Sequence, residues 1–187
     1  MKTETPSIPL VRGKFLAPLI RGVRGVSVFR LKKLSDWDQV VKFIIPKLKP
    51  GTIIALSGPL GAGKTTFVQH LAKALGVRST PRSPTFSLVR SYRLHPTSYM
   101  PTRLLHVDAY RIEHTHDLTP LNLQEELTVP GTIMALEWPE NIKKWLMNQP
   151  NKKIFISIKL HPRNFRTCKI TGDAEEGSRS RRKPSDG

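Results

Sequence analysis

Residues 58–65 have the residue types and the spacing of a phosphate-binding loop. The segment matches the pattern G-x-x-x-x-G-K-[ST] at every fixed position, and an apolar run precedes it. Its glycines let the backbone curl so that successive N–H groups point at phosphates. The helix expected after the loop would present its positive N-terminus to the same phosphates. A glycine-rich turn with no ligand is the alternative.

This loop predicts the binding and hydrolysis of a nucleoside triphosphate. We expect the Lys64 amine to reach the β- and γ-phosphates and the Thr65 hydroxyl to bind Mg²⁺. The predicted nucleotide contacts in this segment are Gly58, Pro59, Leu60, Gly61, Ala62, Gly63, Lys64, Thr65 and Thr66.

Two carboxylates follow apolar runs farther along the chain. Asp108 ends the run 104–108, and Glu137 ends the run 132–137. Ligands bind outside the carboxyl ends of parallel strands, so we expect both side chains near the phosphates. One would hold Mg²⁺ directly or through water, and the other would orient or activate the attacking water. Which carboxylate touches the metal stays open, and a capping role is the structural alternative for each.

Residues 83–86, Ser-Pro-Thr-Phe, lie between the expected P-loop helix and the next strand. A loop hydroxyl at this place, such as that of Thr85, can sense a γ-phosphate in a nucleotide switch. An ordinary entry into a strand is the alternative interpretation.

The elements that would position these residues alternate between strand and helix patterns. Ser35, with Asp38 three residues on, is expected to cap a helix that Pro46 ends. Further helices are expected at 64–75, where Gly76 suits the C-terminal cap, and at 139–146. Strands are expected at 26–31, 52–57, 85–92, 103–107 and 132–137, and a closing hairpin at 153–160 and 166–171.

The pattern indicates an α/β protein with a P-loop NTPase-like three-layer fold. Its mixed sheet would be parallel around the P-loop and antiparallel at one edge. We expect one P-loop domain over 26–172, preceded by a disordered basic arm over 1–25 and followed by a disordered tail over 173–187. A targeting peptide is the alternative interpretation of the arm.

The composition restricts the partners. Residues 1–25 hold five basic and one acidic residue and 173–187 hold four of each, so 26–172 carry +13 of the formal net charge of +17. A polyanion such as RNA is the partner this predicts, with a basic surface that has no partner as the alternative.

No apolar run approaches the roughly 18 residues that span a bilayer. The single cysteine, Cys168, excludes an internal disulfide and fits a cytoplasmic protein.

Taken in order, the segments 56–66, 83–86, 106–111 (His-Val-Asp-Ala-Tyr-Arg) and 136–140 (Leu-Glu-Trp-Pro-Glu) resemble one known family. They are similar to the bacterial TsaE (YjeE) ATPases of tRNA threonylcarbamoyladenosine biosynthesis, over about residues 28–172. The P-loop alone is unspecific. The H-x-D-x-Y-R and E-W-P-E segments, at this order and spacing, make the resemblance strong.

The resemblance implies a P-loop ATPase that uses ATP and Mg²⁺ and has low activity alone. It implies a complex with a TsaB–TsaD pair and a role in the modification of adenosine 37 in tRNA. By motif match, Thr65 and Glu137 would hold Mg²⁺, and Asp108 would be catalytic or organise the metal. Lys64 would hold the phosphates, and Thr85 would belong to a nucleotide-responsive loop. Trp138 would lie beside the site, with a core position as its alternative, and Arg166 would help to hold the nucleotide.

The sequence also departs from the family. Pro59 stands where the family usually has Asp or Glu, which removes a charge near the phosphates, and 93–102 resembles an enlarged loop. The strong basic balance is unusual and raises the idea of direct tRNA contact. Two other functions remain open. A nucleotide-dependent RNA-binding switch would use ATP only to set conformation, and a small-molecule kinase would need an arginine-rich lid, for which few residues are available.

Overall fold

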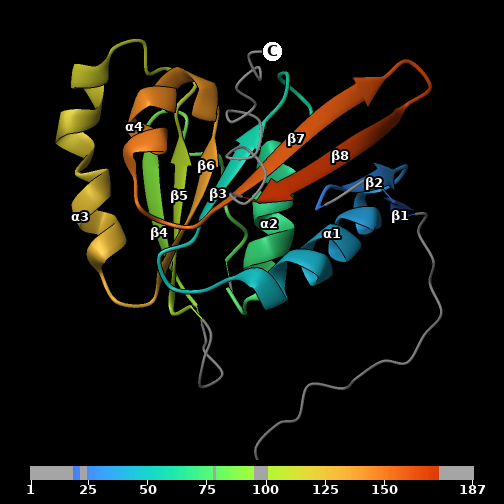
Figure 1. The fold of residues 1–187 in the computed structure, drawn as a ribbon, viewed down its shortest axis with the longest axis horizontal. Coiled ribbons are helices and arrows are strands. Elements are labelled where there is room, and N and C mark those ends of the chain that lie inside the picture. Colours follow the sequence, from blue (N-terminus) through green and yellow to red (C-terminus); the bar gives the residue numbers. More distant parts are fainter. Residues whose placement is uncertain (1–18, 22–24, 78, 95–100, 173–187) are drawn as a thin grey trace, which may run out of the picture.

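The computed structural model describes residues 19–21, 25–77, 79–94 and 101–172, which form a mixed β-sheet with helices on both faces (Figure 1). The strands lie in the order β1-β2-β8-β7-β3-β6-β5-β4. They are β1 Leu19–Arg21, β2 Ser27–Leu31, β3 Ile53–Ser57, β4 Val89–Arg93, β5 Arg103–Asp108, β6 Thr132–Glu137, β7 Lys153–His161 and β8 Phe165–Gly172. The α-helices are α1 Trp37–Ile44, α2 Lys64–Ala74, α3 Leu123–Thr128 and α4 Lys143–Asn148, and 3-10 helices cover Leu34–Asp36, Ile45–Lys47, Thr115–Leu121 and Pro139–Ile142.

Four neighbouring strands in the middle of the sheet, β7, β3, β6 and β5, are parallel. β4 pairs antiparallel with β5 at one edge, and β8, β2 and β1 continue the sheet antiparallel at the other. The predicted α/β three-layer fold is confirmed, with antiparallel strands on both sides of the parallel centre rather than at one edge. The parallel strands bring the carboxyl ends of β3, β5 and β6 to a common side of the sheet.

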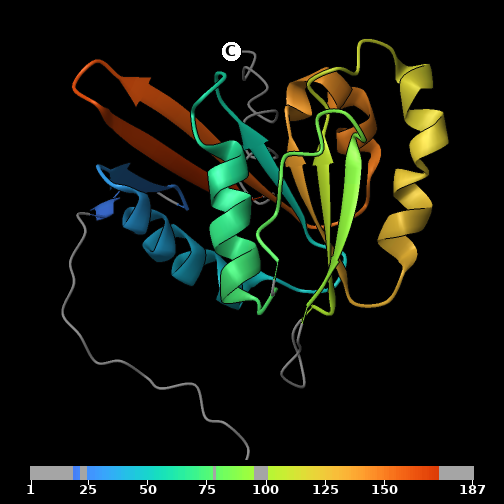
Figure 2. The ribbon, with the colours of Figure 1, turned by 180° about the vertical axis from the view of Figure 1, so that it is seen from behind.

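The side chains of β3 alternate between two hydrophobic clusters, because successive residues of a strand point to opposite faces. Ile54 and Leu56 pack with residues of α1 and α2, in a cluster that also buries Cys168 of β8. Ile53 and Ala55 pack on the opposite face with residues of α3 and α4. Figure 2 shows α1 and α2 in front of the sheet, and Figure 1 shows α3 and α4 on the other side. These two layers hold β3 rigidly behind the P-loop.

The predicted cap at Ser35 was wrong. Ser35 lies inside the 3-10 helix Leu34–Asp36, and α1 begins only at Trp37. The Asp36 carboxylate accepts hydrogen bonds from the backbone N–H groups of Lys32 and Lys33, at 2.7 and 3.0 Å. Asp38 lies 2.7 Å from Nδ1 of His70 on α2. The carboxylate of Asp36, two residues before Asp38, therefore closes the start of this helical segment.

The strand predicted at 85–92 begins at Val89 instead. Residues 85–87 form a turn, and Leu88 follows with a left-handed φ of +60°. The reason is local, because the Thr85 hydroxyl binds Asp108 at the end of β5 rather than pairing in the sheet. The remaining predicted strands and helices match the observed elements within a few residues.

The predicted arm and tail lie mostly outside the described residues, as do residues 95–100 of the predicted loop 93–102. Within the range 1–25, Leu19–Arg21 forms β1 and pairs antiparallel with β2. Across the described ranges, no helix has both the length and the apolarity to cross a bilayer.

Candidate functional site: a phosphate-binding cleft with two carboxylates

The P-loop connects the end of β3 to the start of α2, as the sequence predicts. Three of its glycines have left-handed φ values: +148° at Gly58, +74° at Gly61 and +104° at Gly63. A Cβ atom on Gly58 would lie 2.6 Å from the carbonyl oxygen of Ile158 in β7. A side chain at position 58 would therefore push the loop away from the sheet. The α2 helix then starts at Lys64, with its N-terminus facing the loop.

Lys64 is a buried cation folded against the loop that precedes it. Its Nζ donates hydrogen bonds to the carbonyl oxygens of Gly58 and Pro59, at 2.7 and 3.1 Å. It also lies 3.7 Å from the centroid of the Trp138 ring. Burial lowers the pKa of Lys64 below its ordinary value, and the nearby negative charge of Glu137 opposes this shift. A polyphosphate beside Nζ would compensate for the loss of hydration.

Glu137 joins the P-loop helix to the interior of the sheet. Its Oε1 and Oε2 accept hydrogen bonds from the Thr65 hydroxyl, at 2.8 and 3.1 Å. Its Oε1 also lies 2.8 Å from Nε2 of His106, a fully buried residue of β5. Glu137 itself is 3% exposed. Thr65 and Glu137, the two residues that the resemblance assigns to Mg²⁺, are thus in direct hydrogen-bond contact.

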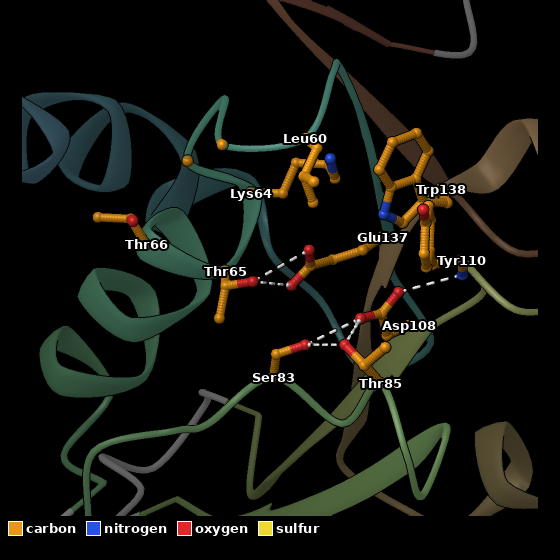
Figure 3. A pocket seen from close by; sticks show the side chains of 12 residues that line it. Leu60, Lys64, Thr65, Thr66, Ser83, Thr85, Asp108, Tyr110, Glu137 and Trp138 are labelled. Atoms are coloured by element: carbon orange, nitrogen blue, oxygen red, sulfur yellow. Dashed lines mark hydrogen bonds between the residues drawn. The ribbon is translucent and has the colours of Figure 1, made fainter.

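Asp108 stands opposite Glu137 in the register of β5 and β6 but has different partners. Its Oδ2 accepts hydrogen bonds from the hydroxyls of Ser83 and Thr85, at 2.8 and 2.7 Å. Its Oδ1 accepts one from the backbone N–H of Tyr110, at 3.1 Å. Figure 3 shows this second set beneath the Thr65–Glu137 pair. The carboxylate therefore ties the loop after α2 to the cleft.

The rings of Trp138 and Tyr110 lie together on one side of the cleft (Figure 3). Trp138 has a left-handed φ of +58°, and its ring centroid lies 5.0 Å from that of Tyr110. The indole contacts Lys64 on the cleft side and also packs against the hydrophobic cluster of the α3–α4 face. The prediction that Trp138 lies beside the site therefore agrees with the geometry.

These groups surround a cleft of about 410 Å³. It is lined by Leu60, Gly61, Gly63, Lys64, Thr65, Thr66, Ser83, Thr85, Asp108, Tyr110, Glu137 and Trp138. Most predicted site residues are thus brought together. Gly58, Pro59 and Ala62 belong to the loop without lining the cleft, and the Thr66 side chain points away from the carboxylates (Figure 3).

Arg166 is not brought into the cleft. It lies in β8, opposite Leu160 of β7 and Leu31 of β2, and it does not line the cavity. The start of β8 is separated from the P-loop by β7 in the strand order. The structure thus gives no support to a nucleotide contact by Arg166.

Sequence reasoning missed the contributions of Ser83, His106 and Tyr110. A usable signal existed for His106, because residues two apart on a strand share a face and His106 precedes Asp108 by two. A polar residue inside an apolar strand also needs a partner, which is Glu137 here. The signal for Ser83 was only its place in the segment 83–86, because its contact with Asp108 depends on how the loop folds back.

The chain matches a family model described as threonylcarbamoyl adenosine biosynthesis protein TsaE over residues 31–168. It is 36% identical over 145 residues to the tRNA threonylcarbamoyladenosine biosynthesis protein TsaE of Rickettsia bellii, covering 76% of this chain and 93% of that one. It is 40% identical over 116 residues to the TsaE of Synechocystis, covering 61% and 71%. The chain belongs to the TsaE family. It therefore has a place in tRNA threonylcarbamoyladenosine biosynthesis, the role for which the family is named.

A solved structure is similar to this chain in fold and in sequence. The crystal structure of Bacillus subtilis YdiB superposes with a TM-score of 0.59 at 26% identity, covering 79% of this chain and 85% of that one. The family match spans the P-loop and both carboxylates, so the cleft lies within the TsaE region of the chain.

Proposed function

We propose that the protein is the ATPase subunit of a tRNA threonylcarbamoyladenosine-modifying assembly and hydrolyses ATP with Mg²⁺ in this cleft. The observation that carries the proposal is the Thr65–Glu137 pair, which puts a hydroxyl and a carboxylate together at the start of the P-loop helix. In P-loop NTPases such a pair is the protein's share of the Mg²⁺ site. The buried and partly dehydrated Lys64 supplies the cation for the phosphates.

The residues present fit a magnesium–triphosphate pair. Among the described residues no three His, Cys, Asp or Glu side chains form a metal cage. Mg²⁺ does not need one, because it commonly takes one or two protein oxygens and completes its shell with water and phosphate. Thr65 and Glu137 would hold the ion, which would neutralise charge on the phosphate oxygens. Lys64 Nζ donates hydrogen bonds to the carbonyl oxygens of Gly58 and Pro59. Phosphate oxygens can accept these hydrogen bonds in place of the two carbonyls.

Asp108 is the carboxylate that we assign to the attacking water. Its Oδ2 is held by two hydroxyls and its Oδ1 by the backbone N–H of Tyr110, so the group has a fixed orientation at the edge of the cleft. It would orient the water and accept a proton. Lys64 would stabilise the negative charge that grows on the phosphate oxygens. Trp138 would shield that side of the cleft from solvent.

The hydroxyls of Ser83 and Thr85 connect the cleft to a surface loop that a partner could contact. They contact Asp108, while the next residue in the loop, Phe86, is 87% exposed. A change in the cleft would therefore alter a surface loop, as in nucleotide switches. We propose that this loop reports the nucleotide state to a TsaB–TsaD pair during modification of adenosine 37. A cytoplasmic location is part of the same proposal, supported by the tRNA-modifying role of the family.

One alternative keeps support from a specific observation. The loop linkage at Asp108 also suits a nucleotide-dependent RNA-binding switch, in which ATP sets conformation without turnover as its purpose. A small-molecule kinase has no comparable support, because the residues that line the cleft include no arginine.

Purified full-length protein should hydrolyse ATP slowly alone and faster with the TsaB–TsaD pair. Lys64→Ala and Glu137→Ala should remove the stimulated activity, and Lys143→Ala, an exposed lysine of α4, serves as the matched control. Stimulated turnover that survives in both site variants would disprove the site assignment. Nucleotide-dependent partner binding without turnover would favour the switch.

A further inference from the structure

A second surface lies at the far edge of the sheet from the α3 helix. Odd-numbered residues of β7 and β8 pair directly across the hairpin, His161 with Phe165 and Lys159 with Thr167. Arg30 of β2 lies opposite Thr167, so it joins the same face. We call Arg30, Lys159, His161, Phe165 and Lys169 the basic face.

The basic face is not covered by a helix of the described residues. α1 and α2 pack behind these strands, where Cys168, Ile158 and Phe29 are buried. On the other side, α3 and α4 lie over the β4–β6 half of the sheet, and the β7–β8 hairpin extends away from them (Figure 1). Lys159 and Lys169 are exposed.

The charge on this face is of one sign. The strands β2, β7 and β8 contain no aspartate or glutamate. Arg163, in the turn between β7 and β8, adds a further exposed cation. The ion pairs found among the described residues involve other residues, at His70, Arg103 and His106. Within the described part of the chain, a polyanion would therefore meet positive charge that no carboxylate of these three strands compensates.

The basic face also contains a phenyl ring and an imidazole ring beside its charged side chains. The Phe165 and His161 rings stack with centroids 4.3 Å apart and planes at 6°. The Arg30 guanidinium lies 4.0 Å from the Phe165 centroid. β8 lies between β2 and β7 in the sheet, so Phe165 lies between Arg30 and His161. The result is a stacked pair, His161 and Phe165, with the Arg30 guanidinium beside it.

Among the described strands, none pairs with β7 at His161 on the side away from β8. β3 ends at Ser57, which pairs with Ser157, and β7 continues to His161 beyond that point. On this arrangement a planar group would extend the stack at the half-buried imidazole, whose Nε2 lies 3.0 Å from Oγ1 of Thr167. Flat rings beside uncompensated lysines are the two components of a surface for single-stranded nucleic acid, on which bases stack and phosphates meet cations.

We propose that the basic face binds a single-stranded segment of RNA, with a base stacked on His161 and phosphates at Lys159 and Lys169. The choice of RNA over another polyanion rests on the proposed function in tRNA modification. The face is separate from the ATP cleft, since none of its residues lines that cavity. RNA binding at the basic face would give a function to part of the chain's unusual excess of basic residues.

The test measures the affinity of the full-length protein for a fluorescent single-stranded RNA of about twelve nucleotides. Binding should weaken as salt rises. The double variant Lys159→Gln, Lys169→Gln should reduce the slope of log affinity against log salt by about 1.4, since each single-strand phosphate contact contributes about 0.7. Lys159→Arg with Lys169→Arg should restore the wild-type slope.

The matched control is Lys42→Gln with Lys73→Gln, which removes the same charge from exposed positions of α1 and α2 on the opposite face. Its slope should be that of the wild type. Phe165→Leu should lower the affinity about tenfold and leave the slope unchanged, because it disrupts stacking without removing charge. Unchanged thermal unfolding in each variant separates these effects from misfolding.

Three outcomes would overturn the proposal. The wild type could show no RNA affinity at low salt, or the control pair could lose as much slope as the basic-face pair. The basic-face pair could also keep its RNA affinity and lose only its association with the TsaB–TsaD pair, which would make the face a protein-docking surface. Partner-stimulated ATP turnover is measured in the same proteins. Stimulated turnover without RNA affinity would contradict only the RNA-binding proposal, whereas a wild type without stimulated turnover would contradict the proposed ATPase function.

Discussion

Glu137 and Asp108 end adjacent parallel strands at the same register, yet the molecule treats them differently. Glu137 is held from the inside, by Thr65 of the P-loop helix and by the fully buried His106. Asp108 is held from the outside, by two hydroxyls of a loop whose next residue is exposed to solvent. The comparison teaches that two similar carboxylates at the ends of adjacent strands can be anchored differently, one by buried groups and the other by a surface loop.

The largest effect should come from Glu137→Gln. The amide keeps the size of the side chain but loses the charge that would hold Mg²⁺, so partner-stimulated turnover should fall about a thousandfold. Steady-state ATP hydrolysis at increasing Mg²⁺ measures the loss. If Asp108→Asn proved more sensitive to Mg²⁺ than Glu137→Gln, the two roles would have to be exchanged.

Asp108→Asn should reduce turnover about a hundredfold, because general-base groups typically contribute 10²–10⁴. ATP affinity should change little, since Thr65, Lys64 and Glu137 remain in place. Hydrogen exchange of the backbone at residues 83–88 should become faster in this variant, and not in Glu137→Gln. Equal protection of this loop in the two variants would contradict the division between an internal and a surface-coupled carboxylate.

His106→Leu removes the buried donor to Glu137. The apparent Mg²⁺ affinity should fall about tenfold, as is usual for a group that orients a metal ligand. Stability should fall by about 1–3 kcal/mol, because Glu137 loses a partner in the interior. His106→Gln can still present an N–H near the position of Nε2 and should recover part of the Mg²⁺ affinity. The Nδ1 atom of His106 has no hydrogen-bond partner among the described residues, so its loss costs little.

The smallest effect should come from Ser83→Ala combined with Thr85→Ala. Both hydroxyls are lost, but the backbone N–H of Tyr110 still orients Asp108. We expect turnover of the isolated protein to fall only a few-fold, whereas stimulation by the partner pair should decline further. Arg82→Ala, an exposed residue of the same loop, is the control. If isolated and stimulated turnover fell by the same factor, these hydroxyls would act in ATP hydrolysis and not in the response to the partner pair.

The sequence predicted the fold well where the pattern is local. The apolar run into Gly58, the helix from Lys64 and the strand ending at Glu137 each follow from neighbouring residues, and each is observed. The failures occurred where a long-range contact outweighs local preference. Thr85 suits a strand by type, but its hydroxyl binds Asp108, so the strand begins later.

The site shows the same limit. The P-loop pattern identifies Thr65, and strand ends identify Asp108 and Glu137, but nothing local says which carboxylate meets the hydroxyl. That depends on the order of β3, β6 and β5, in which β6 is the direct neighbour of the P-loop strand. Arg166 lies outside the cleft for the corresponding reason, since its position depends on how the final hairpin attaches to the sheet.

The buried Cys168 has a practical consequence for following the surface loop. Burial raises the pKa of this thiol to about 12, so almost none of it is thiolate near neutral pH. It is also the single cysteine of the chain. The native protein should therefore react very slowly with maleimide reagents. The variant Phe86→Cys would then carry a fluorophore at one defined position. Such a probe would let the nucleotide state of the cleft be watched in real time, without first removing a native thiol.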